Sequence, residues 1–334
     1  MLLTIFLTGA NGFIGQVLLK KLLASRHSVI CQVRSAAARK QVEALGAIAW
    51  QVGLDRQGEL EVQLRSCDVV IHAAACLKLG SSADEFMRVN LRLTKSLLIA
   101  AQAAQVKKFI YLSAASVVMH APQDLFDIDE NATLTQQKEL PYSFSKARAE
   151  ELVLASSTPF FQTVALRPAL VWGAGDAVEC LIAPAINQGK FAWFGDGNYL
   201  FATCYIGNLC AAVEQTLGSK VGGKAFFISD GQTFTFKKFI TARLQVSGFQ
   251  PPSWSVPKGL AWALASFAEN GWAYLPLTGK PPLVREMVRL MGYAFTLNTT
   301  AARRQLNYHP NYSIEQGLAE IMSTNLHNAQ LGKK

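Results

Sequence analysis

Charged residues are scarce in this chain of 334 residues: they make up 16% of it, and no Asp or Glu occurs before Glu43. Half of the residues are apolar, which is enough to fill a large buried interior. A chain of this length is too long for one small core. We therefore expect two packed units.

Dense basic runs are also absent, although the formal net charge is +9. Such a charge could indicate a nucleic acid or a membrane surface as partner. The Lys and Arg residues are scattered, however, and no zinc-finger or RNA-binding signature occurs. The composition therefore favours a basic protein with an anionic cofactor, and no nucleic-acid partner is predicted.

Metal-binding patterns are missing. None of the six cysteines forms a C-x-x-C pair, no Cys/His spacing is typical of a metal site, and the five histidines are isolated. Most of the cysteines lie inside apolar stretches. We predict no metal site and expect buried free thiols in a reducing compartment, which is the basis for predicting a cytoplasmic protein.

No stretch has the character of a targeting signal or an integral membrane segment. Residues 1–19 carry no charge, but three glycines and an Asn interrupt them. Residues 256–277 are apolar and rich in Trp, and Lys258, Glu269 and Asn270 interrupt that stretch. Two interpretations of it stay open, namely contact with a membrane surface and the lining of a pocket.

The first half of the chain alternates apolar strands with amphipathic helices, which predicts a parallel sheet. Expected strands cover 3–8, 28–33, 69–73, 109–113 and 163–167, and expected helices cover 13–24 and 90–104. From Val171 onward the pattern loosens. We predict an α/β protein with a Rossmann-type doubly wound parallel sheet and a smaller C-terminal α/β substrate domain. The dinucleotide-binding domain would comprise 1–170 with 203–228, and the substrate domain 171–202 with 229–334.

A glycine turn follows the first strand: Thr8–Gly15 reads TGANGFIG. In this interpretation Gly9 permits the tight turn, Gly12 lets the backbone approach a pyrophosphate, and Gly15 allows close packing of helix on strand. The N-terminus of the helix offers free N–H groups to the phosphates. Glycine turns also occur for structural reasons alone, but strand, spacing and helix agree here. The predicted cofactor-binding residues of the turn are Gly9, Asn11, Gly12, Phe13, Ile14 and Gly15.

The end of the second strand indicates which dinucleotide is bound. An NAD enzyme places an acid there for the ribose 2′-hydroxyl, whereas an NADP enzyme offers Arg to the 2′-phosphate. This strand ends with Val33, Arg34 and Ser35. Arg34 could be an ordinary surface residue, but the missing acid argues against that. We predict that NADP(H) is preferred over NAD(H).

A tyrosine and a lysine four residues apart, Tyr142 and Lys146, follow the helix-opening Pro141. This spacing puts the phenol and the ammonium on one face of a helix. A nearby cation lowers the pKa of a phenol, which could then exchange a proton with a substrate oxygen while a hydride moves. Lys146 could also hold the nicotinamide ribose. Such a pair is common by chance, but its position downstream of the glycine turn favours catalysis.

Taken in order, these motifs resemble an extended short-chain dehydrogenase/reductase over nearly the whole chain. They are TGANGFIG, His72-Ala-Ala-Ala75, Val89-Asn90, the strand 109–113, the Tyr142/Lys146 pair and Arg167-Pro168. LRPALVWGAGD (166–176) and PPLVREMVRLM (281–291) resemble the 3β-hydroxysteroid dehydrogenase branch, which includes reductases of 2-alkyl-3-oxoalkanoates and dihydroflavonols. The resemblance implies further cofactor-binding residues at Asp55, Ala73, Ala74 and Pro168.

Three positions depart from the family pattern. The family's second hydroxyl residue after the fourth major strand, which bonds the substrate oxygen, is Ala114 here; Ser113 or Ser116 could replace it, and Ser113 is the predicted catalytic residue. The adenine-side Gly-Asp-Leu reads Gly53-Leu54-Asp55, so that the acid is displaced by one position. The acid often found near 205–209 is replaced by Gly207-Asn208.

The sequence thus predicts an NADP(H)-dependent oxidoreductase that interconverts a ketone and a secondary alcohol on a largely apolar substrate. The resemblance implies that this substrate is a steroid-like molecule, a long-chain 3-oxo acid, or a polyketide- or flavonoid-like molecule. Aromatic residues of the second half would line an apolar pocket or form a core: Phe191, Trp193, Phe194, Trp254, Trp262, Phe267, Trp272 and Tyr274. One alternative is a nucleotide-sugar epimerase or dehydratase, with Lys190, Lys224 and Arg285 as candidate cations. Another is a cofactor-bound binding or sensor protein without turnover. A homodimer is compatible with the sequence.

Overall fold

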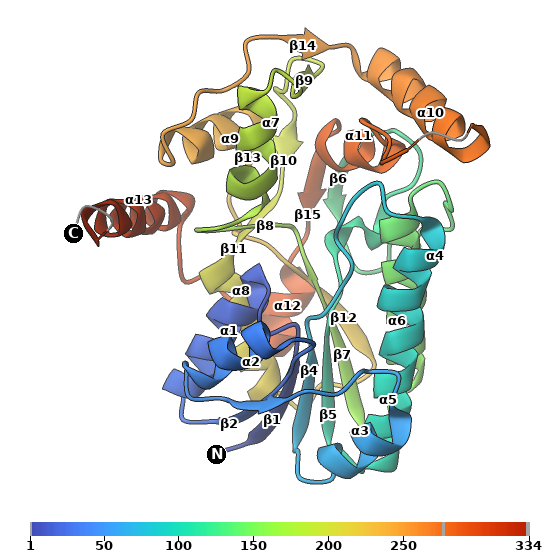
Figure 1. The fold of residues 1–334 in the computed structure, drawn as a ribbon, viewed down its shortest axis with the longest axis vertical. Coiled ribbons are helices and arrows are strands. Elements are labelled where there is room, and N and C mark those ends of the chain that lie inside the picture. Colours follow the sequence, from blue (N-terminus) through green and yellow to red (C-terminus); the bar gives the residue numbers. More distant parts are fainter. Residues whose placement is uncertain (1, 276–277, 332–334) are drawn as a thin grey trace.

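The computed structural model describes residues 2–275 and 278–331, and within them a sheet of seven parallel strands forms the centre (Figure 1). Several segments predicted from the sequence end at residues outside the described ones, namely Met1, Pro276, Leu277 and residues 332–334. All neighbouring strands run parallel, so their carboxyl ends share one edge of the sheet. The strand order is β12 (Lys224–Ile228), β7 (Gln162–Pro168), β5 (Lys108–Leu112), β4 (Val69–His72), β1 (Thr4–Thr8), β2 (Ser28–Gln32) and β3 (Ile48–Trp50).

Helices cover both faces of this sheet, which confirms the predicted doubly wound α/β fold. Alternate residues of a strand enter different cores: Ile5 and Leu7 pack on one face and Phe6 on the other. Burial on both faces explains why the strands are continuous apolar runs. The first face carries α1 (Phe13–Ala24) and α8 (Ile206–Gly218), and the second carries α3 (Gln57–Leu64), α5 (Leu93–Ala103) and α6 (Pro141–Ala155).

The predicted strands agree with the observed ones to within one residue at each end, and the first helix has the predicted bounds. The helix expected over 90–104 differs, because a π-helical turn (Met87–Arg92) precedes α5. Asn90 lies on this turn, where its side chain bonds the backbone of Cys76 and the hydroxyl of Ser145. Turns of this kind are frequent at functional sites.

Beyond the carboxyl edge of the central sheet, the described chain builds smaller sheets and a second group of helices (Figure 1). The division into two domains stays a prediction; β6, from the first predicted domain, pairs with β15 of the second. The small sheets are β13 (Phe234–Thr235), β10 (Leu200–Phe201), β15 (Phe295–Leu297) and β6 (Leu125–Ile128); β8 (Leu170–Trp172) with β11 (Thr203–Tyr205); and β9 (Trp193–Phe194) with β14 (Ser255–Val256). The helices of this group are α7 (Ala183–Asn187), α9 (Phe236–Gln245), α10 (Lys258–Tyr274), α11 (Arg285–Met291) and α13 (Ile314–Leu331). In contrast, α12 (Thr300–Leu306) packs along β12 of the central sheet, where the side chain of Gln305 accepts from the Nζ of Lys224.

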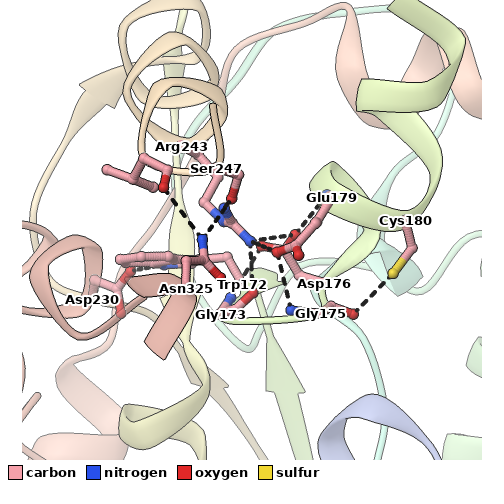
Figure 2. A network of polar contacts seen from close by, with 11 residues as sticks. Trp172, Gly173, Gly175, Asp176, Glu179, Cys180, Asp230, Arg243, Ser247 and Asn325 are labelled. Carbon is pink, nitrogen blue, oxygen red and sulfur yellow. Dashed lines mark hydrogen bonds and ion pairs between the residues drawn. The ribbon is translucent and has the colours of Figure 1, made fainter. Parts of the chain in front are cut away.

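Arg243, a buried residue of α9, forms hydrogen bonds and ion pairs with the segment 173–179 that follows β8 (Figure 2). The Nε of Arg243 donates to Asp176 at 2.9 Å, and its Nη2 donates to Glu179 at 2.9 Å and to the Gly173 carbonyl at 3.0 Å. Its Nη1 donates to the hydroxyl of Ser247 at 2.6 Å. Each nitrogen of this fully buried side chain therefore has an acceptor, as the burial of a charge requires.

Within the described part of the chain, no helix combines the length and apolarity needed to cross a membrane. α10 covers most of the apolar, Trp-rich stretch 256–277, and within this helix only Ala261 and Ala265 are buried. Leu260, Leu264 and Phe267 are exposed by 52%, 49% and 80%. This helix therefore presents an apolar face to the surroundings.

Candidate active site

The glycine turn joins β1 to α1 at the carboxyl edge of the central sheet. Gly9 has a φ of +73°, and a Cβ there would lie 2.7 Å from the backbone nitrogen of Ala74. A Cβ on Gly15 would lie 2.0 Å from the carbonyl oxygen of Gly9. Packing within the protein therefore requires glycine at both positions. Gly12 differs, because a Cβ there would make only an ordinary contact of 3.4 Å with that oxygen.

The first turn of α1 offers backbone donors to a ligand. Asn11 and Gly12 are exposed, and Phe13 and Ile14 are half-buried. No side chain caps the helix and no acidic residue lies in its first turn. The N–H groups and the positive end of the helix dipole are thus uncompensated, which suits an anion.

Arg34 and Asp55 lie after the neighbouring strands β2 and β3, at the same edge of the sheet. Arg34 is exposed, and the adjacent Ser35 caps α2 (Ala36–Glu43). Asp55 is exposed in the turn before α3, whereas Leu54 is buried in the core. The displaced acid therefore points outward, and the leucine beside it serves packing.

Ala73 and Ala74 follow β4 and are half-buried beside the glycine turn. The N–H of Ala74 donates to the hydroxyl of Thr8, which lies 2.7 Å from Nδ1 of His72. The Nε2 of His72 lies 2.8 Å from the hydroxyl of Thr94. Burial lowers the pKa of His72 to about 3. His72 is therefore neutral near pH 7 and connects the ends of β1 and β4 to α5.

The predicted catalytic pair lies at the start of α6, which begins at Pro141 as expected. Lys146 is 2% exposed; its Nζ donates to the carbonyl oxygen of Leu112 at 2.5 Å and lies 4.1 Å from the centroid of the Tyr111 ring. These contacts place the ammonium against the end of β5. Tyr142, one helical turn earlier, is half-buried.

Burial dominates the protonation of this pair. It lowers the pKa of Lys146 to about 7, against the opposing charge of Glu150. It raises the pKa of Tyr142, and the charge of Glu286 raises it further. The pKa of Tyr142 therefore shifts upward, opposite to the direction expected from a neighbouring cation. The phenol carries its proton near neutral pH, which suits a proton donor.

Two serine hydroxyls lie close to the end of β5. The N–H of Ser113 donates to the Leu166 carbonyl at 2.8 Å and to the Tyr111 carbonyl at 3.1 Å, so the backbone leaves the regular strand geometry directly after Leu112. Both Ser113 and Ser116 have buried hydroxyls that find no hydrogen-bond partner in the described residues. Ala114 between them is also buried. Unpaired buried hydroxyls are costly, and the hydroxyls of Ser113 and Ser116 share this state with those of Tyr111 and Thr163.

One residue of the site, Glu286 of α11, was not found from the sequence. Its Oε2 accepts from the Tyr142 N–H at 2.7 Å, and its Oε1 accepts from the N–H and the hydroxyl of Ser143 at 2.8 and 2.7 Å. The carboxyl group therefore caps α6 from a segment far along the chain. The sequence did indicate that α6 needs a cap from elsewhere, because the side chain of Leu140, the residue before Pro141, cannot accept a hydrogen bond.

The remaining predicted site residues are spread over the molecule. Pro168 is buried at the end of β7 beside β12. The aromatics proposed for an apolar pocket divide between core and surface. Phe191, Trp193 and Phe194 are buried in core clusters, Trp262 packs against one of these, and Trp254, Phe267 and Tyr274 are exposed by 50%, 80% and 85%.

The cations considered for a second diphosphate do not converge. Lys190 contacts Gln188, and Arg285 forms an ion pair with Glu269. Lys224 begins β12 and therefore lies at the opposite edge of the sheet from the glycine turn. This arrangement gives the epimerase alternative no support.

Comparison with known proteins identifies the family. The model of the 3-beta hydroxysteroid dehydrogenase/isomerase family matches residues 6–258. A 4-hydroxy-2-methyl-3-oxo-4-farnesyl-3,4-dihydroquinoline-1-oxide ketoreductase of Stigmatella aurantiaca is 34% identical and covers 94% of each chain. A 2-alkyl-3-oxoalkanoate reductase of Stenotrophomonas maltophilia is 31% identical over 96% of this chain and 98% of its own. A decarboxylating sterol-4-alpha-carboxylate 3-dehydrogenase of Dictyostelium discoideum is 27% identical over 95% and 99%.

Among solved structures, an epimerase from Methanothermobacter thermautotrophicus has a TM-score of 0.77 at 16% identity and covers 99% of this chain and 94% of its own. A UDP-glucose 4-epimerase from Thermotoga maritima has a TM-score of 0.75 at 18% identity, covering 98% and 99%. These likenesses establish the fold alone. The chain belongs to the 3-beta hydroxysteroid dehydrogenase/isomerase family, and it is an oxidoreductase of the extended short-chain dehydrogenase/reductase type.

Proposed function

We propose that this oxidoreductase interconverts a ketone and a secondary alcohol on a largely apolar substrate, with NADP(H) as the preferred cofactor. The observation that carries the proposal is the placement of Tyr142 and Lys146 on one turn of α6, against the end of β5. The names of the relatives, a ketoreductase and a 3-oxoalkanoate reductase among them, support the same chemistry and an apolar substrate.

The carboxyl edge of the sheet fits a dinucleotide. None of the described residues comes close enough to require glycine at Gly12, whereas close approach of a pyrophosphate to its backbone would require it. The uncapped first turn of α1 supplies N–H donors to that anion. When bound, the nicotinamide supplies or accepts the hydride.

We assign the other binding roles to side chains and backbone at the same edge. Arg34 would bind the 2′-phosphate of NADP(H), for which an exposed guanidinium at the end of β2 is suited. Asp55 would serve the adenosine side. Ala73, Ala74 and Pro168 would form part of the walls of the cofactor site.

In the reducing direction Tyr142 gives its proton to the carbonyl oxygen as negative charge develops there. Its raised pKa keeps this proton in place until it is needed. Lys146 donates one N–H to the carbonyl oxygen of Leu112, and its other N–H groups are available to the phenol and the ribose. Ser113 provides the second donor to the substrate oxygen, since its hydroxyl has no partner in the described structure.

The test of this proposal is Tyr142→Phe, which keeps the ring but removes the transferable proton. Cofactor binding should survive, while turnover of an apolar ketone falls by about two decades or more. Tyr308→Phe is the matched control, because Tyr308 is a fully buried tyrosine whose hydroxyl donates to the carbonyl oxygen of Ser229, after the end of β12. An unaltered rate in Tyr142→Phe would contradict the assigned role. Cofactor binding without turnover of any ketone or alcohol would favour a binding or sensor protein.

Contact with a membrane surface, a homodimer and a cytoplasmic location stay predictions. The exposed apolar residues Leu260, Leu264 and Phe267 of α10 support the first of these. Flotation of the protein with liposomes, compared with a Leu264→Ser/Phe267→Ser variant, tests it. Sedimentation equilibrium tests the second.

A further inference from the structure

Arg289 of α11 is a buried cation that forms no ion pair with any residue that the structure describes. It is 1% exposed, and its Nε donates to the carbonyl oxygen of His120 at 3.2 Å. Neither Nη1 nor Nη2 contacts a hydrogen-bond acceptor within residues 2–275 and 278–331. Burial lowers the pKa of Arg289 to about 10, so that the guanidinium is still charged at neutral pH.

The other two arginines buried to this degree in the described structure are compensated. Arg243 has an acceptor for each nitrogen (Figure 2). Arg167 bonds the carboxylate of Glu150 through both Nε and Nη2, with a shortest distance of 2.6 Å. An unpaired buried charge is strongly destabilising. The lack of a carboxylate at Arg289 therefore needs a reason.

The acid that acts on Arg289 is already engaged. Asp124 raises the pKa of Arg289 through its charge, but its Oδ1 accepts from the N–H of Ala294 at 2.7 Å and lies 3.8 Å from the Nζ of Lys258. Lys258 and Arg289 lie near the same ring, at 4.9 and 5.6 Å from the centroid of Tyr293. Two cations therefore share one half-exposed acid, which leaves an excess of positive charge.

This charge lies beside the predicted reaction centre. Glu286 and Arg289 are three residues apart on α11, and Glu286 bonds the backbone of Tyr142 and Ser143. From the other side, the His120 carbonyl that Arg289 contacts lies four residues after Ser116. The guanidinium is therefore bracketed by the two segments that hold the proton donor and the unpaired hydroxyls.

We propose that Arg289 is a substrate-recognition residue and binds an anionic oxygen, above all a carboxylate, that the substrate carries near the reacting carbonyl. This assignment rests on the proposed ketone and alcohol chemistry, and it makes a 3-oxo acid or 3-hydroxy acid the preferred substrate class. Two free Nη groups in one plane match the two oxygens of a carboxylate. Side chains that cover these groups must move when the substrate enters, as they must for the equally buried hydroxyls of Ser113 and Ser116.

The experiment compares 3-hydroxy-2-methyldecanoate with its methyl ester, both oxidised with NADP⁺ and NAD⁺ and followed by nicotinamide absorbance. The parent should oxidise the acid with a kcat/KM at least about tenfold above that of the ester. Arg289→Met should lower kcat/KM for the acid by about 10- to 100-fold and leave that for the ester within about threefold. Arg285→Met, which removes a cation already paired with Glu269 on the same helix, should lower both values equally or neither.

Thermal unfolding separates recognition from a structural role. Replacement of an unpaired buried charge by an apolar side chain of similar length is neutral or stabilising, so the Tm of Arg289→Met should equal or exceed that of the parent. A lower Tm together with equal losses for acid and ester would overturn the proposal. Arg289→Lys, which keeps the charge without the planar fork, should give an intermediate loss for the acid alone.

Calorimetric titration of the same acid onto the cofactor-loaded protein needs no turnover. Acid binding that Arg289→Met abolishes, in a parent that oxidises neither compound, would support the anion site and contradict the proposed function. Equal oxidation of acid and ester by the parent and by Arg289→Met would overturn the anion site and leave the proposed function standing. Absence of acid binding to the parent would also overturn it.

Discussion

Glu286→Gln should remove a pH dependence of stability that arises at the N-terminal cap of α6. Burial raises the pKa of Glu286 from 4.5 to about 7, although the hydrogen bonds from Ser143 and Tyr142 oppose this. The folded carboxyl therefore keeps its proton up to about pH 7, whereas the unfolded one loses it near pH 4.5. Since the unfolded state binds fewer protons in this window, stability falls as the pH rises through it. Glutamine has no proton to lose.

The size of this effect follows from the two pKa values, at about 1.4 kcal/mol for each tenfold change in proton affinity. The full contribution is about 3 kcal/mol, present below pH 4.5 and lost above about pH 7. Between pH 5 and pH 7.5 the change amounts to about 2 kcal/mol. The free energy of unfolding of Glu286→Gln, relative to the parent, should therefore rise by about 2 kcal/mol over this interval.

Urea denaturation followed by circular dichroism at several pH values provides the measurement. The difference between variant and parent is decisive, because His72 acts in the opposite sense: its pKa is lowered from 6.5 to about 3, so it adds stability as the pH rises through that range. Glu61→Gln, which removes an exposed ion pair with Arg65 on α3, is the control and should show little change with pH. A constant difference between Glu286→Gln and the parent from pH 5 to pH 7.5 would refute the reasoning.

Three further predictions concern the cofactor, the hydroxyl donor and the glycine turn. If Arg34 binds the 2′-phosphate, calorimetry should show that NADPH binds about one to two decades more tightly than NADH. Arg34→Ala should remove most of this difference in affinity. Equal affinities for the two cofactors in the parent would contradict the assignment. Ser113→Ala should lower the rate by at least about tenfold and Ser116→Ala by less, and a reversed order in steady-state kinetics would show that Ser116 is the donor. Gly15→Ala should destabilise the protein by about 2 kcal/mol or more in denaturant titrations, because the added Cβ would lie 2.0 Å from the Gly9 carbonyl oxygen. The control is Gly58→Ala on α3, which should be neutral or stabilising because the space around Gly58 is open. Similar losses of stability in both variants would contradict the packing argument.

Local patterns in the sequence predicted the parts of the fold that depend on local physics. Continuous apolar runs and the glycine turn place β1, α1 and their neighbours, because strand burial and helix periodicity are properties of short segments. The four-residue spacing of Tyr142 and Lys146 is sufficient to put both on one face of α6. Similarly, Arg34 could be located after β2 by counting from the end of a strand. Its contact with a cofactor stays a prediction.

Long-range packing decided the rest. Glu286 accepts from the backbone N–H of Tyr142, which lies 144 positions earlier in the sequence. Neither residue type nor spacing identifies Glu286 as the residue that caps α6. The upward shift of the Tyr142 pKa likewise depends on burial and on the charge of Glu286, which act on the phenol only once the chain has folded around it.

The sequence by itself determined the parallel sheet, the glycine turn and the helix that carries the Tyr142/Lys146 pair. The tertiary structure alone decided that Glu286 caps this helix, that the hydroxyls of Ser113 and Ser116 lack partners, and that Arg289 is buried without a counter-ion. The physical reason is that segment-level signals specify periodicity and turn geometry, whereas burial and compensation of charge are properties of groups that meet only in the folded chain.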